Sequence, residues 1–379
     1  MTFIINGQLS NNSTILGNEF YFFYRDSGLE FWAFFMAFLI ACCAISGNIM
    51  NAFLVYVTAK NKTLRSSTNY LLAQHSFCEF FHQSGHYIFL YTIFSGKNFI
   101  TYSVSTVFQI QSILGYNSAV FTMFETATDR LLCVLTPSFY SKTVGPIYLA
   151  MFSFLAFIPG AILAFLVINY AIENPNEAVT GQLSDICTPI ELIYNYNLFM
   201  CILCIISYII IGAIVLKKVK ENQNKRNADY QHQRNAKLLR SLLAIIIIMV
   251  GSYFLNTLLR KFVNDILHLG PIGLWYVNVA GGVIVNIGAA SNTPILYATS
   301  SEYRKVIDKE LNSIFGKYWK ITVPKPPKNL LGTTATPNEV QNVNNNGNNN
   351  MARINVLNSL TDPKSVRVHP TPINFLPII

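Results

Sequence analysis

The chain has 379 residues, of which only 12% are charged, while 52% are hydrophobic and 13% are aromatic. A soluble domain carries about 25% charged residues, so this composition excludes an ordinary soluble protein. The hydrophobic content excludes a disordered chain, and seven cysteines are too few for a small disulfide-stabilised scaffold. The composition therefore indicates a helical membrane protein.

Seven segments have the length and apolar content of membrane-spanning helices. They cover about residues 31–58, 68–94, 104–133, 145–169, 192–216, 239–260 and 272–298. The second and third segments also carry His, Glu, Gln and Asn side chains, which are costly in lipid and usually face the protein interior. We therefore predict an all-α membrane protein, a seven-transmembrane bundle over residues 31–300, with the second and third helices at its centre.

The Lys and Arg residues predict the orientation of this bundle. If residues 1–30 lie outside the cell, the external segments hold only four of these residues, and the other 23 are cytoplasmic. Cytoplasmic loops of membrane proteins carry such an excess. We expect an extracellular N-terminus, a cytoplasmic C-terminus and no cleavable signal peptide, because residues 1–30 show neither a basic region nor a small-residue cleavage site.

The two ends of the chain have patterns of their own. Asn11 and Asn12 begin overlapping glycosylation triplets on the predicted extracellular side. Residues 301–316 predict a short amphipathic helix, suited to lie on the lipids of the inner leaflet. The tail over 317–379 is rich in Pro and Asn and is expected to be disordered and cytoplasmic.

The sequence gives no positive support for an enzyme. It contains no P-loop, nucleophile elbow or HExxH pattern. His82 and His86 lie four residues apart, a permissible spacing for metal ligands, but no third ligand is evident. We therefore expect no metal, no cofactor and no nucleic-acid partner, and we expect the two histidines to form interior hydrogen bonds or to contact a ligand.

Three polar residues lie at matching depth in the predicted spans. Asn48, Glu79 and Asn286 are each about 15–18 Å above the cytoplasmic edge, at 1.5 Å per helical residue. A carboxylate at this depth requires polar partners. The three residues are expected to form either a static hydrogen-bonded core or a network that rearranges between two states, and the two interpretations are compatible.

An Asp129-Arg130 pair closes the third predicted span. An ion pair at the membrane edge is only partly desolvated, so it can be broken at modest cost. The position of the pair therefore suits a reversible latch better than a permanent structural link.

These residues carry a resemblance. Gly47-Asn48, Asp129-Arg130 and the run 292–297 (Asn-Thr-Pro-Ile-Leu-Tyr) resemble the rhodopsin-like G-protein-coupled receptors. The runs 63–69, 82–86 and 96–100, together with Pro137 and Tyr140, are similar to the nematode chemoreceptor-type serpentine receptors of class SX. The resemblance is strongest over about 45–145 and extends through the sixth and seventh spans.

The resemblance implies roles for residues at the cytoplasmic end. Arg130 would leave Asp129 on activation and meet the C-terminal helix of a Gα subunit. Tyr297 would swing inward beside it, Pro294 would supply the kink, and Tyr208 would be a second inward tyrosine. With Asn292 added to the three residues at matching depth, the predicted intramembrane polar network consists of Asn48, Glu79, Asn286 and Asn292.

The sequence departs from the receptor pattern at two places. Ser105 stands where a cysteine usually ties the third helix to the second outer loop, so Cys187 in that loop is expected to have no bridge. The Trp-x-Pro motif of the sixth helix is absent, and either Tyr253 or Phe254 could act as the aromatic switch or simply pack there.

The resemblance places a ligand cavity between helices two, three, five, six and seven. The candidates to face it are His82, His86, Gln109, Ser112, Tyr116, Asn256 and Trp275. Ser112 occupies the place of the aspartate in aminergic receptors, so a monoamine ligand is not expected. A neutral or weakly polar small molecule and a short peptide both remain open.

The leading hypothesis is a chemosensory receptor that binds an external ligand and activates a heterotrimeric G protein. The resemblance implies a multi-pass location in the plasma membrane, in a sensory cilium. Two alternatives stay open: a seven-span ligand-gated channel or transporter, and a non-signalling partner of another receptor. Transporters usually contain internal repeats, and none is evident between spans 1–3 and 5–7.

Overall fold

The computed structural model describes residues 3–5, 8–10, 17–222 and 247–316. Asn11 and Asn12, residues 223–246, which include the first part of the predicted sixth span, and the tail over 317–379 lie outside the described residues. The predictions made for them therefore stay predictions.

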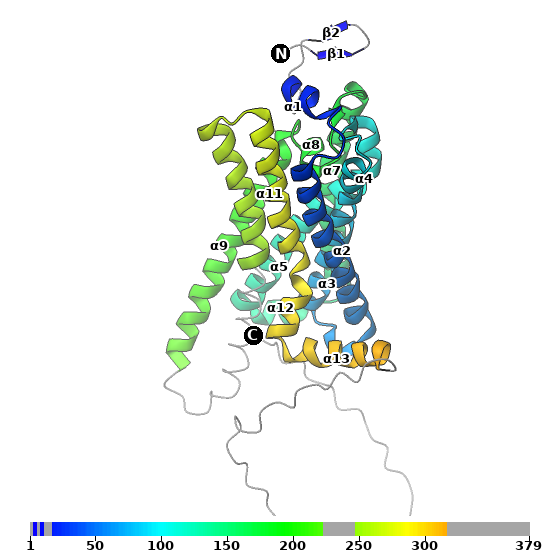
Figure 1. The fold of residues 1–379 in the computed structure, drawn as a ribbon. Coiled ribbons are helices and arrows are strands. Elements are labelled where there is room, and N and C mark those ends of the chain that lie inside the picture. The colour runs from blue at the N-terminus through cyan, green and yellow to red at the C-terminus, as the bar shows by residue number, and fades with distance from the viewer. Residues whose placement is uncertain (1–2, 6–7, 11–16, 223–246, 317–379) are drawn as a thin grey trace, which may run out of the picture.

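The described part of the chain is a bundle of long helices that run side by side (Figure 1). The first three spans are α2 (Phe31–Lys60), α3 with α4 (Ser67–Ser84 and His86–Phe94) and α5 (Tyr102–Leu135). The last four are α7 (Pro146–Glu173), α9 (Glu191–Asn222), a helix over residues 247–262, and α11 with α12 (Pro271–Ala290 and Asn292–Thr299). Each lies where a membrane span is predicted, although α9 extends six residues beyond the predicted end at 216.

Hydropathy alone finds fewer spans. Among the described residues, four helices are long and apolar enough to cross a membrane: α2, α7, α11 and the Glu191–Lys217 part of α9. The polar helices α3 and α5 instead have most of their polar side chains buried, and α3 packs extensively against α5. Their polar residues therefore face protein rather than lipid, as the sequence predicts.

Shorter elements cap the bundle. At one end lie the hairpin β1–β2 (Phe3–Ile5 and Gln8–Ser10), α1 (Gly17–Tyr24), α8 (Leu183–Cys187) and the π-helical turn Val263–Leu267. The other end carries the 3-10 turn Lys62–Leu64, α6 (Pro137–Thr143) and α13 (Ser301–Phe315). These two ends are called the α1 end and the α13 end below.

The loop before α9 folds over the α1 end of the bundle. Its strand β4 (Ala178–Val179) pairs antiparallel with β3 (Ile100–Thr101), with Ile100 opposite Val179. The pairing holds residues 178–187, called the lid below, against the start of α5. Within the lid, α8 and its flanking residues are almost entirely buried.

A glycine sets the close approach of the two central helices. A Cβ atom on Gly115 of α5 would lie 2.5 Å from the carbonyl oxygen of Cys78 and 2.7 Å from the backbone nitrogen of His82. Only glycine permits backbones to pack this tightly. The contact brings the polar side chains of α3 directly against α5.

The helix α13 lies across the base of the bundle (Figure 1). It spans Ser301–Phe315, where the amphipathic helix is predicted, and buries Tyr303 and Ile307. Lys60 at the end of α2 donates to Glu310 at 2.7 Å and fixes the helix to the first span.

Candidate functional site

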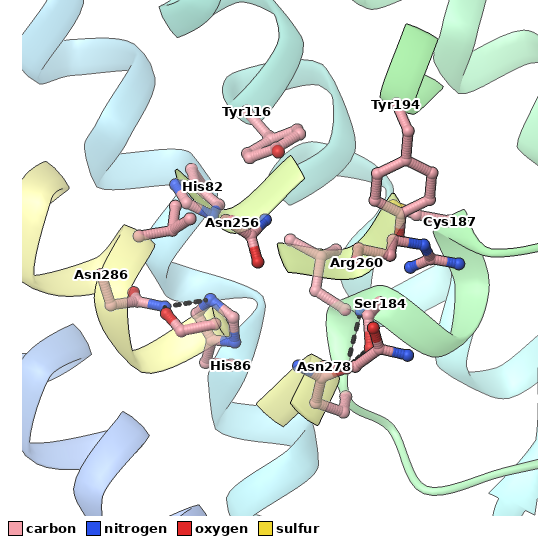
Figure 2. A pocket seen from close by; sticks show the side chains of 14 residues that line it. His82, His86, Tyr116, Ser184, Cys187, Tyr194, Asn256, Arg260, Asn278 and Asn286 are labelled. Carbon is pink, nitrogen blue, oxygen red and sulfur yellow. Dashed lines mark hydrogen bonds between the residues drawn. The ribbon is translucent and has the colours of Figure 1, made fainter. Parts of the chain in front are cut away.

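A small cavity opens within the bundle near its α1 end, between α3, α4, α5, α9, α11, the helix over residues 247–262 and the lid. Its volume is about 50 Å³. Four of the seven residues predicted to face a ligand lie on its wall, and Figure 2 shows them: His82, His86, Tyr116 and Asn256. These four residues share one cavity, and their role as ligand contacts stays a prediction.

The other three candidates take part in packing contacts instead. Gln109 donates to the carbonyl oxygen of Gly181 at 2.5 Å, and Ser112 donates to the carbonyl oxygen of His82. Trp275 donates to the hydroxyl oxygen of Thr180 at 3.3 Å. Two of these side chains therefore fasten the lid to α5 and α11, and neither they nor Ser112 lie on the cavity wall.

The wall also contains residues that the sequence analysis did not select as ligand contacts. The polar ones are Gln182, Ser184, Asn278, Arg260 and Asn286. The sequence predicts Asn286 only as a member of the polar network and Arg260 only as an external charge. The helix over residues 247–262 continues past Arg260, whose guanidinium contacts Thr188 and Tyr194, and this side chain is only 8% exposed.

Below the cavity, Glu79 is the centre of a buried polar cluster. Its carboxylate accepts a hydrogen bond from the Tyr253 hydroxyl at 2.6 Å, and His82 Nδ1 lies 2.8 Å from its other oxygen. His75 Nε2 lies 3.3 Å from Glu79 Oε1 but does not have hydrogen-bond geometry. The Nδ1 atom of His75 instead donates to the carbonyl oxygen of Ala119 at 3.1 Å. His82 is thus a direct link between the cavity wall and Glu79.

Tyr253 connects this cluster to the sixth helix. Its ring stacks on Tyr116 with centroids 5.3 Å apart, and the side chain is 1% exposed. Of the two aromatic residues proposed for the switch position, Tyr253 therefore contacts both the cavity wall and the buried carboxylate. Phe254 is only partly buried against the core.

The four residues predicted as one intramembrane network do not bond directly to one another. Asn48 donates to the Tyr87 hydroxyl at 2.7 Å, and Asn286 donates to His86 Nε2 at 2.9 Å. Asn292 donates to Ser76 at 3.3 Å, while Glu79 bonds as described above. Each is buried and paired with a neighbour outside the predicted set.

A residue that the sequence analysis did not select makes the link between α2 and the seventh span. Asn51 donates both to Gln83 at 3.1 Å and to the carbonyl oxygen of Ala289 at 3.1 Å. Gln83 in turn donates to the carbonyl oxygen of Asn286 at 3.3 Å. Asn51, one helical turn beyond Asn48, therefore connects three helices.

At the α13 end, Asp129 and Arg130 form an ion pair inside a ring of hydroxyl groups. Arg130 donates through Nε at 2.9 Å and through Nη2 at 2.5 Å to the same carboxylate oxygen. The second oxygen accepts from Tyr140 at 2.9 Å and from Tyr148 at 3.2 Å. Arg130 Nη2 also donates to Ser67 at 3.2 Å and to Tyr140 at 2.8 Å.

The two switch tyrosines do not contact this ion pair by any described hydrogen bond. Tyr208 is buried, and its hydroxyl has no hydrogen-bond partner among the described residues. Tyr297 is 40% exposed and donates to Asp308 of α13 at 3.0 Å. Pro294 lies in the first turn of α12, just after the interruption at Ser291, so the two parts of the seventh span meet where a kink is predicted.

The lid is attached to α5 by hydrogen bonds. Tyr102 donates its hydroxyl hydrogen to the carbonyl oxygen of Ile186 at 2.7 Å. Cys187 carries a free thiol and is 3% exposed, and Ser105 accepts from Gln109 at 3.1 Å. Burial raises the pKa of the Cys187 thiol to about 12, which makes it unreactive.

Comparisons with known proteins agree with this architecture. A family model described as the serpentine-type 7TM GPCR chemoreceptor Srsx matches residues 44–311, more than half of the chain. No curated protein sequence matches. The crystal structure of squid rhodopsin is similar, with a TM-score of 0.57 and 16% sequence identity over 75% of this chain and 82% of that one. The predicted rhodopsin-like seven-transmembrane fold and the resemblance to this receptor class are confirmed.

Proposed function

Since the chain belongs to the serpentine-type 7TM GPCR chemoreceptor family Srsx, we propose that it detects an extracellular ligand and activates a heterotrimeric G protein through Arg130. The observation that carries this proposal is the placement of two sites at opposite ends of one membrane bundle. The small cavity lies at the α1 end, where we propose that the ligand binds, and the Asp129–Arg130 ion pair, the proposed latch, lies at the α13 end.

The distribution of charge supports an orientation with the α1 end outside the cell. Lys60, Lys62, Arg65, Arg130, Lys142, Arg304, Lys305 and Lys309 lie at or near the α13 end, whereas the α1 end carries Arg25, Lys97, Arg260 and Lys261. Cytoplasmic loops carry the excess of basic residues. The proposed cavity therefore opens toward the outside, and the latch faces the cytoplasm of a cell whose plasma membrane, or sensory cilium, holds the receptor.

The hydrogen bonds also provide a route for coupling between the two ends. A ligand on the cavity wall would contact His82, whose Nδ1 lies 2.8 Å from Glu79. Glu79 holds the sixth helix through Tyr253. A ligand that binds one arrangement of these groups better than another would shift the position of the sixth helix, since differential affinity is what moves a conformational equilibrium.

The cytoplasmic response would be the release of Arg130. In this structure Asp129, Ser67 and Tyr140 hold its guanidinium, and Tyr297 is bonded away from it to Asp308. Release would expose a cation to the C-terminal helix of Gα. Tyr297 would leave Asp308 and swing inward, with Pro294 and the break at Ser291 as the hinge.

The test is G-protein recruitment in a heterologous cell, with a panel of odorants and peptides applied to wild type and to Arg130→Ala. The matched control is Arg65→Ala, which removes an exposed basic side chain at the same end of the bundle. We expect Arg130→Ala to reach the cell surface and to lose signalling, while Arg65→Ala keeps both. Equal G-protein activation by Arg130→Ala would refute the role of this residue.

The same experiment separates the alternatives. A ligand-evoked current that survives both Arg130→Ala and blockade of G proteins would indicate a channel. Ligand binding without a signal, together with a signal when a second receptor is co-expressed, would indicate a non-signalling partner.

A further inference from the structure

The cavity contains one buried cation and no acidic side chain. Of the 14 residues that line it, none is Asp or Glu, and Arg260 is the single basic residue apart from two histidines. Arg260 is 8% exposed, yet among the residues whose side chains the structure describes, which leave out Asp265, no carboxylate lies within 4.0 Å of its guanidinium nitrogens. A buried charge without an oppositely charged partner is unfavourable, so this site favours a ligand that supplies one.

The contacts of Arg260 are with neutral groups. Its Nη2 donates to the Thr188 hydroxyl oxygen at 2.7 Å, and its guanidinium carbon lies 3.7 Å from the centroid of the Tyr194 ring. Both contacts orient the planar guanidinium without neutralising it. An arginine held in this way presents its remaining N–H groups as a fixed fork, which matches a carboxylate.

The nearest acidic group in the lid is already in use. Asp185 accepts hydrogen bonds from the backbone nitrogen of Thr180 at 2.9 Å and from its hydroxyl at 2.6 Å. Its charge attracts Arg260 across a distance longer than an ion pair. The carboxylate of Asp185 is therefore hydrogen-bonded to Thr180 within the lid, and the guanidinium of Arg260 can bind another anion.

His86 supplies a second donor without an acceptor, on the opposite wall of the cavity. The carbonyl oxygen of Gly282 can only accept, so the side-chain nitrogen of Asn286 donates to it at 2.9 Å and donates its other hydrogen to His86 Nε2. The ring hydrogen of His86 is then on Nδ1, which has no hydrogen-bond partner among the described residues. Apart from Arg260, the polar wall is thus rich in uncharged donors.

We propose, on the basis of the receptor function above, that the ligand is a small carboxylic acid whose carboxylate binds Arg260. The remainder of the ligand is uncharged, because the wall offers Asn256, Asn278 and Gln182 but no anion for a cationic group. A cavity of about 50 Å³ holds on the order of four water-sized groups. This size disfavours the short peptide that the sequence leaves open, and the charge of Arg260 favours an acid over the neutral or weakly polar small molecule expected from the sequence.

The test compares acids with their neutral isosteres. Thermal unfolding of the purified full-length receptor in nanodiscs is measured with straight-chain acids from acetate to octanoate, with benzoate, and with the matching primary amides. We expect at least one acid to raise the unfolding temperature while its amide does not. Arg260→Gln should lower the affinity for that acid by about ten- to a hundredfold, the range for a charge-assisted hydrogen bond.

Lys261→Gln is the matched control, since it removes the neighbouring positive charge from a residue that does not line the cavity. It should bind the acid as wild type does. If Arg260→Gln fails to fold, the comparison of acid with amide on the wild-type receptor still shows whether the site prefers a carboxylate. Equal effects of acid and amide, no effect of any acid, or full binding by Arg260→Gln would overturn the inference.

The receptor function can fail separately. Acid binding that needs Arg260 but never activates a G protein would reject the proposed signalling and leave the ligand class standing. Activation by another compound, together with equal effects of acids and amides, would reject the carboxylic acid as ligand and leave the proposed signalling function standing.

Discussion

Tyr140 donates its hydroxyl hydrogen to Asp129, the carboxylate that also holds Arg130. The same hydroxyl oxygen accepts from Arg130 Nη2 at 2.8 Å, so one phenol contacts both members of the ion pair. Tyr140 lies on α6, outside the seven spans, and reaches the end of α5 from the side. The short helix after the third span is therefore part of the latch.

This relationship predicts the effect of Tyr140→Phe. Removing the hydroxyl leaves Asp129 with one donor fewer and Arg130 with one acceptor fewer, a loss of about 1.5–3 kcal/mol for bonds to charged groups. The latched state should lose population by about tenfold or more, and ligand-independent G-protein activation should rise. Basal activation in cells at matched surface expression measures this.

The control for that experiment is Tyr148→Phe, whose hydroxyl bonds to the same carboxylate at the longer distance of 3.2 Å and has no described bond to Arg130. Its effect should be smaller. If both variants signal like wild type without ligand, these hydroxyls do not restrain Arg130.

The bond between Tyr253 and Glu79 makes a prediction about stability. A buried carboxylate that loses a donor at 2.6 Å is left with an unsatisfied oxygen, so Tyr253→Phe should lower the free energy of unfolding by about 1.5–3 kcal/mol. In a Glu79→Gln background the acceptor is neutral, and the same change should matter less. Thermal unfolding of the four proteins forms a double-mutant cycle. Equal losses in both backgrounds would mean that the tyrosine acts through packing alone.

The attachment of the lid by hydrogen bonds can be tested through Cys187. Tyr102→Phe removes the bond to the carbonyl oxygen of Ile186, a loss of about 0.5–1.5 kcal/mol. The lid should open more often, and alkylation of the buried Cys187 thiol should become a few-fold to about tenfold faster. Mass spectrometry of the labelled peptide measures the rate. Tyr91→Phe, at an exposed position of α4, is the control and should label like wild type.

The sequence predicts the seven spans closely because span length and hydropathy depend on the bilayer rather than on tertiary detail. The two polar spans follow from the cost of polar groups in lipid, and the burial of Glu79 and Gln109 agrees with that reasoning. The amphipathic pattern likewise locates α13, since its apolar stripe has helical spacing. These features depend on the residues of one segment at a time.

The contacts between segments were harder to predict. Depth along a helix does not determine which polar side chain reaches a neighbouring helix, so Asn48 was selected where Asn51 makes the connection. Tyr140 carries part of the family resemblance, but nothing in the sequence indicates its contact with Asp129. Arg260 looks like a loop charge in the sequence, and only its tertiary contacts with Thr188 and Tyr194 show that it is buried on the cavity wall.

The lid also predicts a dependence on pH. Burial raises the pKa of Asp185 from its ordinary value of 3.8 to about 6, although its hydrogen bonds from Thr180 and the charge of Arg260 act in the opposite direction. The folded protein therefore binds this proton more tightly than the unfolded chain does. The contribution of Asp185 to stability is complete below about pH 4 and is lost as the pH rises through 6.

The difference between the two pKa values corresponds to about 3 kcal/mol of unfolding free energy across this window. Other groups titrate in the same range, so the informative quantity is the difference between wild type and Asp185→Asn, whose amide oxygen still accepts from Thr180. We expect wild type to gain unfolding temperature relative to the variant as the pH falls from 7 to 4. Parallel melting curves for the two proteins would show that Asp185 titrates near its ordinary value and that the lid does not exclude water from it.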